Sequence, residues 1–296
     1  MLRLVLTAGL GAILLSAHAQ LKRFYSLDNV SSFDTVEFSL HATSGTSFFR
    51  NVQGGNPLNI FGNPDLDKIN PSFNGQLDGR TYIVDLQLDE YKSSSLGDGL
   101  VYAMFSNKEE EEGNYWKILL NDLKVYRLNL DYGIGSSDID LSGTAVENLM
   151  LKTGSADITV NYQKDQPNRI EMDTFMVKVD LGSFSGNDLY YSRAKNLIAE
   201  IGFGQAKLDF SKAMESTCNV KASVGAGKLI IILPKDEPVI IKIKDSPLCG
   251  ISMVKNFEEV ENNVFVNMAY NARARNLLKF DIDLALGNVY FEYEKD

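Results

Sequence analysis

The stretch LDYGIGSSDIDLSGTAVENLMLKTGSADITVNY, from Leu130 to Tyr162, contains nearly the same motif twice. GSSDIDL begins at Gly135 and GSADITV begins at Gly154. Related motifs follow, GQAKLDF at Gly204 and GAGKLII at Gly225. Local spacings of about twenty residues are typical of a solenoid, in which stacked units share one core.

Apolar and polar residues alternate on both sides of these glycines. Leu149 and Leu151 run up to Gly154, and Ile158 and Val160 follow it. Because successive side chains of a strand point to opposite faces, each unit is predicted to be a strand, a tight turn and a second strand. The glycine permits a sharp turn and the close approach of the next unit. Since the alternation recurs almost throughout, the sequence predicts an all-β protein with β-solenoid-like, stacked strands.

Two regions are predicted after the N-terminal leader. Residues 20–126 contain short strands interrupted by Gly, Asn and Pro, and they form a smaller N-terminal β region. Residues 127–296 form the β-repeat domain. Helical patterns are few, and the segment YSRAKNLIAE, residues 191–200, is predicted as a strand because Leu197 and Ala199 continue the alternation.

The repeat also predicts where its charged residues lie. With the four glycines aligned, Asp138, Asp157, Lys207 and Lys228 take equivalent positions, and Asp138 shares its outward face with Asp140. Stacked carboxylates could bind calcium or contact a polymer, so Asp138, Asp140 and Asp157 are candidate binding residues. The same charges on a solvated face would discourage aggregation, which leaves a structural role open. The chain lacks the GGxGxD repeat of calcium-binding β-rolls, and no dedicated metal site is predicted.

The first 19 residues are typical of a secretory signal peptide. Arg3 precedes the apolar run Leu4–Leu15, and Ala17 and Ala19 form an A-x-A pattern before residue 20. The apolar run is too short to span a bilayer comfortably. We therefore predict an exported protein, in the periplasm, on the cell surface or secreted, with no retained transmembrane segment.

The composition limits the chemistry of the chain. A formal net charge of −10 repels phosphate backbones, so nucleic acid is not an expected partner. Of the two histidines, His18 lies in the signal peptide and His41 ends an alternating stretch, where a structural or solvated role is expected. A multi-histidine zinc site cannot be built, and a Ser–His–Asp mechanism would depend on His41 alone. We predict that the protein is not an enzyme and uses no cofactor.

Cys218 and Cys249 leave two interpretations open. In an oxidising compartment they could form a disulfide that closes a loop of about 30 residues. They could equally remain two free, buried thiols.

Several segments together resemble the toast-rack family. They are GSSDIDLSG, GSADITV, the stretch ILPKDEPV at residues 232–239, and the closing FDIDLALGNVYFEY at residues 280–293. The same segments are similar to the LiaF-like C-terminal domain, named for a cell-wall-active antibiotic response, and to proteins of the bacterial adhesin type. The similarity spans roughly residues 116–293, and the preceding part resembles the domain that precedes toast-rack repeats. This resemblance implies a stacked-strand fold in the bacterial envelope and no catalytic residues.

These observations favour a secreted or cell-envelope protein with a binding, adhesion, scaffold or sensor role. An envelope polysaccharide or a protein is the expected partner, and Tyr132, Tyr190 and Tyr191 could stack on sugars or fill the core. A polysaccharide-processing enzyme is one alternative, which would need two carboxylates at a defined separation. A strand-adding assembly factor is another, with the C-terminal strand Val289–Tyr293 as the candidate edge.

Overall fold

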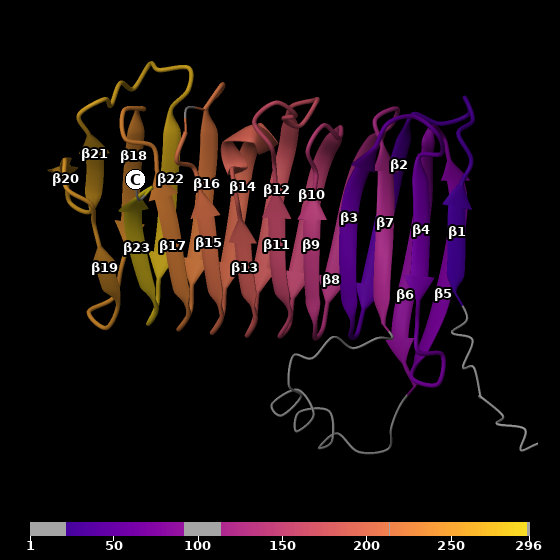
Figure 1. The fold of residues 1–296 in the computed structure, drawn as a ribbon. Helices are drawn as coiled ribbons and strands as arrows, with labels where there is room; N and C mark the ends of the chain where they lie inside the picture. Colours follow the sequence, from indigo (N-terminus) through magenta and orange to yellow (C-terminus); the bar gives the residue numbers. More distant parts are fainter. Residues whose placement is uncertain (1–21, 92–113, 213, 295–296) are drawn as a thin grey trace, which may run out of the picture.

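The computed structural model describes residues 22–91, 114–212 and 214–294. The predicted signal peptide, residues 1–19, lies outside this part of the chain. Two long β-sheets face each other and form one elongated stack (Figure 1). The 3₁₀ turn η1 (Leu189–Ser192) lies between two of the strands. The predicted all-β, stacked-strand fold is confirmed.

The two sheets are named here A and B, and their strands are given in spatial order. Sheet A has 11 strands: β1 (Arg23–Leu27), β4 (Leu58–Asn63), β7 (Tyr115–Asn121), β3 (Thr46–Val52), β9 (Ser136–Asp140), β11 (Asp157–Asn161), β13 (Ser183–Gly186), β15 (Gln205–Asp209), β17 (Lys228–Leu233), β23 (Asn288–Tyr293) and β19 (Gly250–Ser252). Sheet B has 12 strands: β20 (Phe257–Glu261), β21 (Val264–Asn267), β18 (Val239–Lys244), β22 (Leu278–Leu284), β16 (Cys218–Val224), β14 (Ala194–Ile201), β12 (Met172–Val179), β10 (Val146–Thr153), β8 (Val125–Tyr132), β2 (Thr35–Ala42), β6 (Thr81–Glu90) and β5 (Ile69–Asp78).

The repeating unit, called a rung here, is one sheet-B strand, a glycine turn and the next sheet-A strand. In the rung β8/β9, the chain leaves sheet B at Tyr132, turns through residues 133–135 and enters sheet A at Ser136. Equivalent strands of successive rungs pair in parallel. The turns therefore lie along one long edge of the stack, the lower edge in Figure 1.

The core is the space between the two sheets. Alternate residues of every rung point inward, so that equivalent positions form apolar columns along the stack. One such column in sheet B contains Phe38, Leu128, Leu149, Phe175, Leu197, Val220 and Phe280, all of them buried. The segment 191–200 confirms its predicted strand from Ala194 onward, whereas Tyr191 and Ser192 belong to η1.

The order of the rungs in space differs from their order in the chain at both ends. The rung β2/β3 lies between the rung β8/β9 on one side and the strands β6 and β7 on the other. The C-terminal rung β22/β23 likewise lies between β16/β17 and β18/β19. Antiparallel pairs, β1 with β4 and β5 with β6 at one end and β20 with β21 at the other, complete the stack.

This arrangement corrects the predicted free edge at Val289–Tyr293. Strand β23 lies inside sheet A, because β17 pairs with one side of it and β19 pairs with the other side at Asn288–Tyr290. The outermost strands are instead β1 and β19 in sheet A, and β5 and β20 in sheet B. The proposed boundary between residues 126 and 127 stays a prediction, and both sheets continue across it.

The rungs also stack two residues away from the register that the motif alignment predicts. Asp157 pairs with Ser136 rather than with Asp138. Lys228 likewise pairs with Gln205 rather than with Lys207. The predicted equivalence of these charged residues is therefore wrong, although each still lies on the outer face.

Candidate functional site

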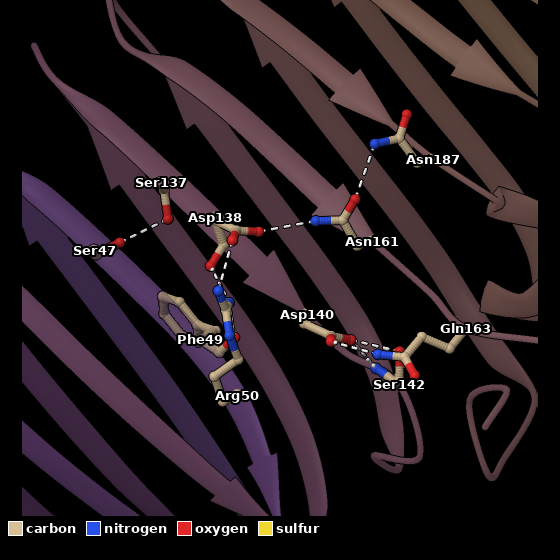
Figure 2. A network of polar contacts seen from close by, with 10 residues as sticks. All are labelled: Ser47, Phe49, Arg50, Ser137, Asp138, Asp140, Ser142, Asn161, Gln163 and Asn187. Carbon is tan, nitrogen blue, oxygen red and sulfur yellow. Dashed lines mark hydrogen bonds and ion pairs between the residues drawn. The ribbon is translucent and has the colours of Figure 1, made fainter.

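A ladder of polar side chains crosses the outer face of sheet A (Figure 2). Asp138 on β9 is its central residue, because one carboxylate oxygen accepts a hydrogen bond from Arg50 on β3 at 2.6 Å. The other oxygen accepts from the Asn161 amide on β11 at 2.8 Å. Asn161 in turn accepts from the Asn187 amide, just beyond β13, at 2.9 Å. The ladder therefore joins four adjacent strand positions with consecutive hydrogen bonds.

The other two candidate carboxylates are also engaged by this chain's own donors. Asp140 accepts from the backbone N–H of Ser142 at 3.0 Å, from the Ser142 hydroxyl, and from the Gln163 amide at 3.1 Å. Asp157 accepts from the Ser183 hydroxyl at 2.6 Å. Within the described residues, no group of three His, Cys, Asp or Glu side chains could hold a metal ion. Binding of calcium or polymer at these aspartates stays a prediction.

A cluster of three hydroxyl groups lies beneath the ladder, on the inner side of sheet A. Tyr132 is buried, and its hydroxyl lies 2.8 Å from that of Ser47 and 3.0 Å from that of Ser137. The two serine hydroxyls are 2.6 Å apart. Burial raises the pKa of Tyr132 to about 12. Since its ring is enclosed, Tyr132 belongs to the core and is not available to a sugar.

The other two candidate tyrosines line a shallow groove of about 340 Å³ beside the ladder's end at Asn187. Tyr190 and Tyr191 form η1, and their ring centroids are 4.1 Å apart. Tyr190 is buried, whereas Tyr191 is partly buried and packs against the core. Lys164 and Lys212, from the neighbouring return loops, complete the lining with Asp188. The sequence indicated the two tyrosines but not Lys164, Asp188 and Lys212, because η1 interrupts the alternation.

The groove combines donors with an aromatic surface. Burial, and then the hydrogen bond to Asp188 at 2.6 Å, raises the pKa of the Tyr190 hydroxyl, which therefore stays protonated. Lys212 pairs with Glu294, and this hydrogen bond raises the pKa of its ammonium group. The exposed Lys164 adds a second cation. The groove can therefore accept a polar ring that offers hydroxyl or carboxylate oxygens.

The remaining candidate residues lie apart from this surface. His41 is half-exposed on sheet B, with ring nitrogens 3.4 Å from Asp131 and 3.8 Å from Asp89. Cys218 is a buried thiol whose pKa burial raises to about 12. Cys249 is a separate, half-buried thiol that donates to the Ser246 carbonyl at 2.8 Å. Formation of the disulfide stays a prediction.

The fold defines the chain as a two-sheet stack of parallel strands with antiparallel ends. The family model described as the N-terminal domain of toast_rack, DUF2154, matches residues 72–183. This match confirms the resemblance to the toast-rack family over that segment. Among the described residues, no helix is long and apolar enough to cross a membrane.

Two solved structures are similar over most of the chain. One is described as a "putative cell adhesion protein" from Clostridium sporogenes, with 14% identity, a TM-score of 0.43, and coverage of 93% of this chain and 99% of that one. The other is described as a "putative adhesin" from Bacteroides fragilis, with 11% identity, a TM-score of 0.33, and coverage of 92% and 96%. The search of curated proteins found no match.

Proposed function

We propose that this protein is an exported, non-enzymatic binding protein that holds an envelope polysaccharide on the outer face of sheet A. The observation that carries the proposal is that the polar ladder ends at Asn187, whose chain neighbour Asp188 lines the tyrosine groove. Asn161 and Asn187 present amides, Thr159 and Ser185 add hydroxyls, and the partly buried Tyr191 ends the row with an aromatic ring. A carbohydrate chain needs this combination of hydrogen-bonding groups and an aromatic face.

The regular rungs suit an extended ligand. Equivalent side chains on neighbouring strands are about 4.8 Å apart, so the ladder offers evenly spaced contacts to a repeating polymer. Stacked-repeat folds often bind partners along such extended surfaces. In this proposal Asp138 and Asp140 keep the ladder in place, because their oxygens already accept hydrogen bonds from Arg50, Asn161 and Gln163.

Asp34 does not have the properties of a glycosidase acid. Glycosidic cleavage by a carboxyl pair calls for an acid whose pKa is raised. Hydrogen bonds from Arg80 instead lower the pKa of the Asp34 carboxyl. Asp34 lies at the start of sheet B's strand β2, away from the groove.

The test is a co-sedimentation assay of residues 20–296 with purified peptidoglycan and other envelope polysaccharides, with calcium and with chelator. We expect saturable binding without shortening of the polymer, and about tenfold weaker binding for Tyr191→Ala and for Asn187→Ala, a loss of about 1.4 kcal/mol. Asn196→Ala is the matched control, because Asn196 lies on the outer face of sheet B. Polymer shortening, or equal losses in all three variants, would contradict the proposal. Loss of binding in chelator would assign calcium to the aspartates.

A further inference from the structure

One residue occupies the tip of each glycine turn, midway between the sheets. On six consecutive rungs, from β8/β9 to β22/β23, these residues are Ile134, Ser155, Leu181, Phe203, Ala226 and Leu286. They are called the apolar stripe below. All six are exposed.

The four large members of the apolar stripe are unusually open to solvent. Ile134 is 42% exposed, Leu181 64%, Phe203 73% and Leu286 55%. With rungs about 4.8 Å apart, the stripe is about 24 Å long. Single exposed apolar residues need no explanation, whereas a contiguous row of them marks an interaction surface.

Over these six rungs the sizes of the residues are symmetric about the centre of the stripe, and the exposed Leu248 of the next rung, β18/β19, lies outside this symmetric part. The order is large, small, large, large, small, large, with Ser155 and Ala226 as the small members. A two-fold axis across the stripe, between Leu181 and Phe203, therefore brings each large residue opposite a large residue of a second copy. Closed two-fold dimers require such self-complementary surfaces.

The charged rows on both sides of the stripe fit the same axis. On the sheet-A side, Asp157 of β11 and Lys228 of β17 lie on the second and fifth rungs of the stripe, equally distant from the axis. Asp157 of one copy would therefore face Lys228 of the second copy, and the reverse. On the sheet-B side, the neighbours Lys178 and Glu200 flank the axis. Lys178 of one copy would therefore face Glu200 of the second copy.

One pair of like charges opposes this arrangement, and one of its two members is already paired with a cation within its own copy. Asp131 would face Asp283 of the second copy. However, Lys244 lies 3.1 Å from Asp283 and offsets that charge within each copy. The rows carry both signs of charge, so they suit a second copy of this chain better than an anionic lipid surface.

From these matches we propose that the protein forms an antiparallel two-fold dimer through the apolar stripe. The inference does not depend on the proposed polysaccharide function. The axis runs through the thickness of the stack, so both copies of sheet A face the same side. Two binding faces would then lie next to each other, which raises the apparent affinity for a long polymer.

The first test is sedimentation equilibrium of residues 20–296. Because the stripe is narrow, its area lies at the low end of specific interfaces, and we expect a dissociation constant of about 1–100 µM. Phe203→Asp should make the protein monomeric with unchanged circular dichroism. Met268→Asp is the matched control, since Met268 is 88% exposed outside the stripe, and it should leave the dimer intact. A wild-type monomer at about 1 mM, or a dimer that resists Phe203→Asp, would overturn the proposal.

The second test uses the charge pair that no single copy can form. Asp157→Lys and Lys228→Asp should each weaken the dimer at least tenfold, because like charges then meet twice across the axis. An equimolar mixture of the two variants should dimerise again, since opposite charges face each other in the mixed dimer. Failure of the mixture to recover would contradict the antiparallel arrangement.

The third test determines the relative orientation of the two copies by disulfide cross-linking, in a protein that also carries Cys249→Ser. A mixture of Ser155→Cys and Ala226→Cys should form a disulfide-linked dimer, whereas Ser155→Cys alone should not. Cross-linking of Ser155→Cys with itself would indicate a parallel dimer and overturn the proposal. Binding of the wild-type monomer to phosphatidylglycerol vesicles, lost in Phe203→Asp, would instead assign the stripe to lipid.

Discussion

In alkaline solution we expect the protein to unfold between about pH 11 and 12, because three tyrosine hydroxyls are enclosed in its core. Burial raises the pKa of Tyr132 from 10.0 to about 12. Burial also raises the pKa of Tyr126 and, together with the nearby Asp140 charge, that of Tyr162. In the unfolded chain these hydroxyls would ionise near their ordinary value of 10.0.

The sign follows from proton binding. Below pH 10 both states keep the tyrosine protons, so the free energy of unfolding is unaffected by these groups. Above that value the unfolded chain releases protons that the folded chain retains. Each tyrosine then lowers the free energy of unfolding by about 1.4 kcal/mol per pH unit, and three lower it by about 8 kcal/mol at pH 12. That amount is comparable with the whole stability of a typical domain, about 5–15 kcal/mol.

The measurement is circular dichroism against pH, with tyrosinate absorbance recorded on the same samples. Tyr162→Phe is the informative variant, because its buried hydroxyl has no hydrogen-bond partner among the described residues. Removing it should leave neutral-pH stability unchanged or higher and move unfolding to higher pH. Tyr132→Phe loses contacts to Ser47 and Ser137, so at neutral pH it should cost about 1 kcal/mol. Tyrosines that all ionise near pH 10 in a folded protein would contradict this account.

Substitution of a single turn glycine should be the most damaging small change in the repeat. Gly204 closes the turn of rung β14/β15, and a Cβ atom added there would lie 2.3 Å from the carbonyl oxygen of Gly182 in the next rung. A backbone oxygen fixed by parallel pairing cannot move away without shifting a whole rung. We therefore expect Gly204→Ala to lower the free energy of unfolding by about 2–3 kcal/mol.

The first glycine of the same turn is the matched control. At Gly202 an added Cβ would lie 3.0 Å from the nearest atom, the Asp180 carbonyl oxygen, so a small adjustment suffices. We expect Gly202→Ala to cost about 1 kcal/mol or less, because reduced freedom of the unfolded chain offsets part of the strain. Urea unfolding of both variants measures the difference. Equal losses would mean that the close approach at Gly204 does not limit the stacking.

The candidate site was predictable only in part. The outward direction of Asp138 and Asp140 follows from period-two alternation, and the structure places both on the outer face. Their partner Arg50 comes from β3, a strand more than eighty residues earlier in the chain. No local pattern links these two segments. Conversely, the apolar stripe has a sequence signal that can be recognised afterwards, an apolar residue between two glycines, as at Phe203 in GFG.

The alternation of apolar residues determined that the chain is all β, which side chains face the core, and where the glycine turns interrupt the strands. The register and the order of the rungs were decided by the tertiary structure alone. Several turns contain two glycines, and a shift of two residues leaves every side chain on its original face, so periodicity cannot distinguish Gly133 from Gly135 as the partner of Gly154. Only packing against the neighbouring rung separates these registers, and only long-range parallel pairing places β2/β3 and β22/β23 inside the stack.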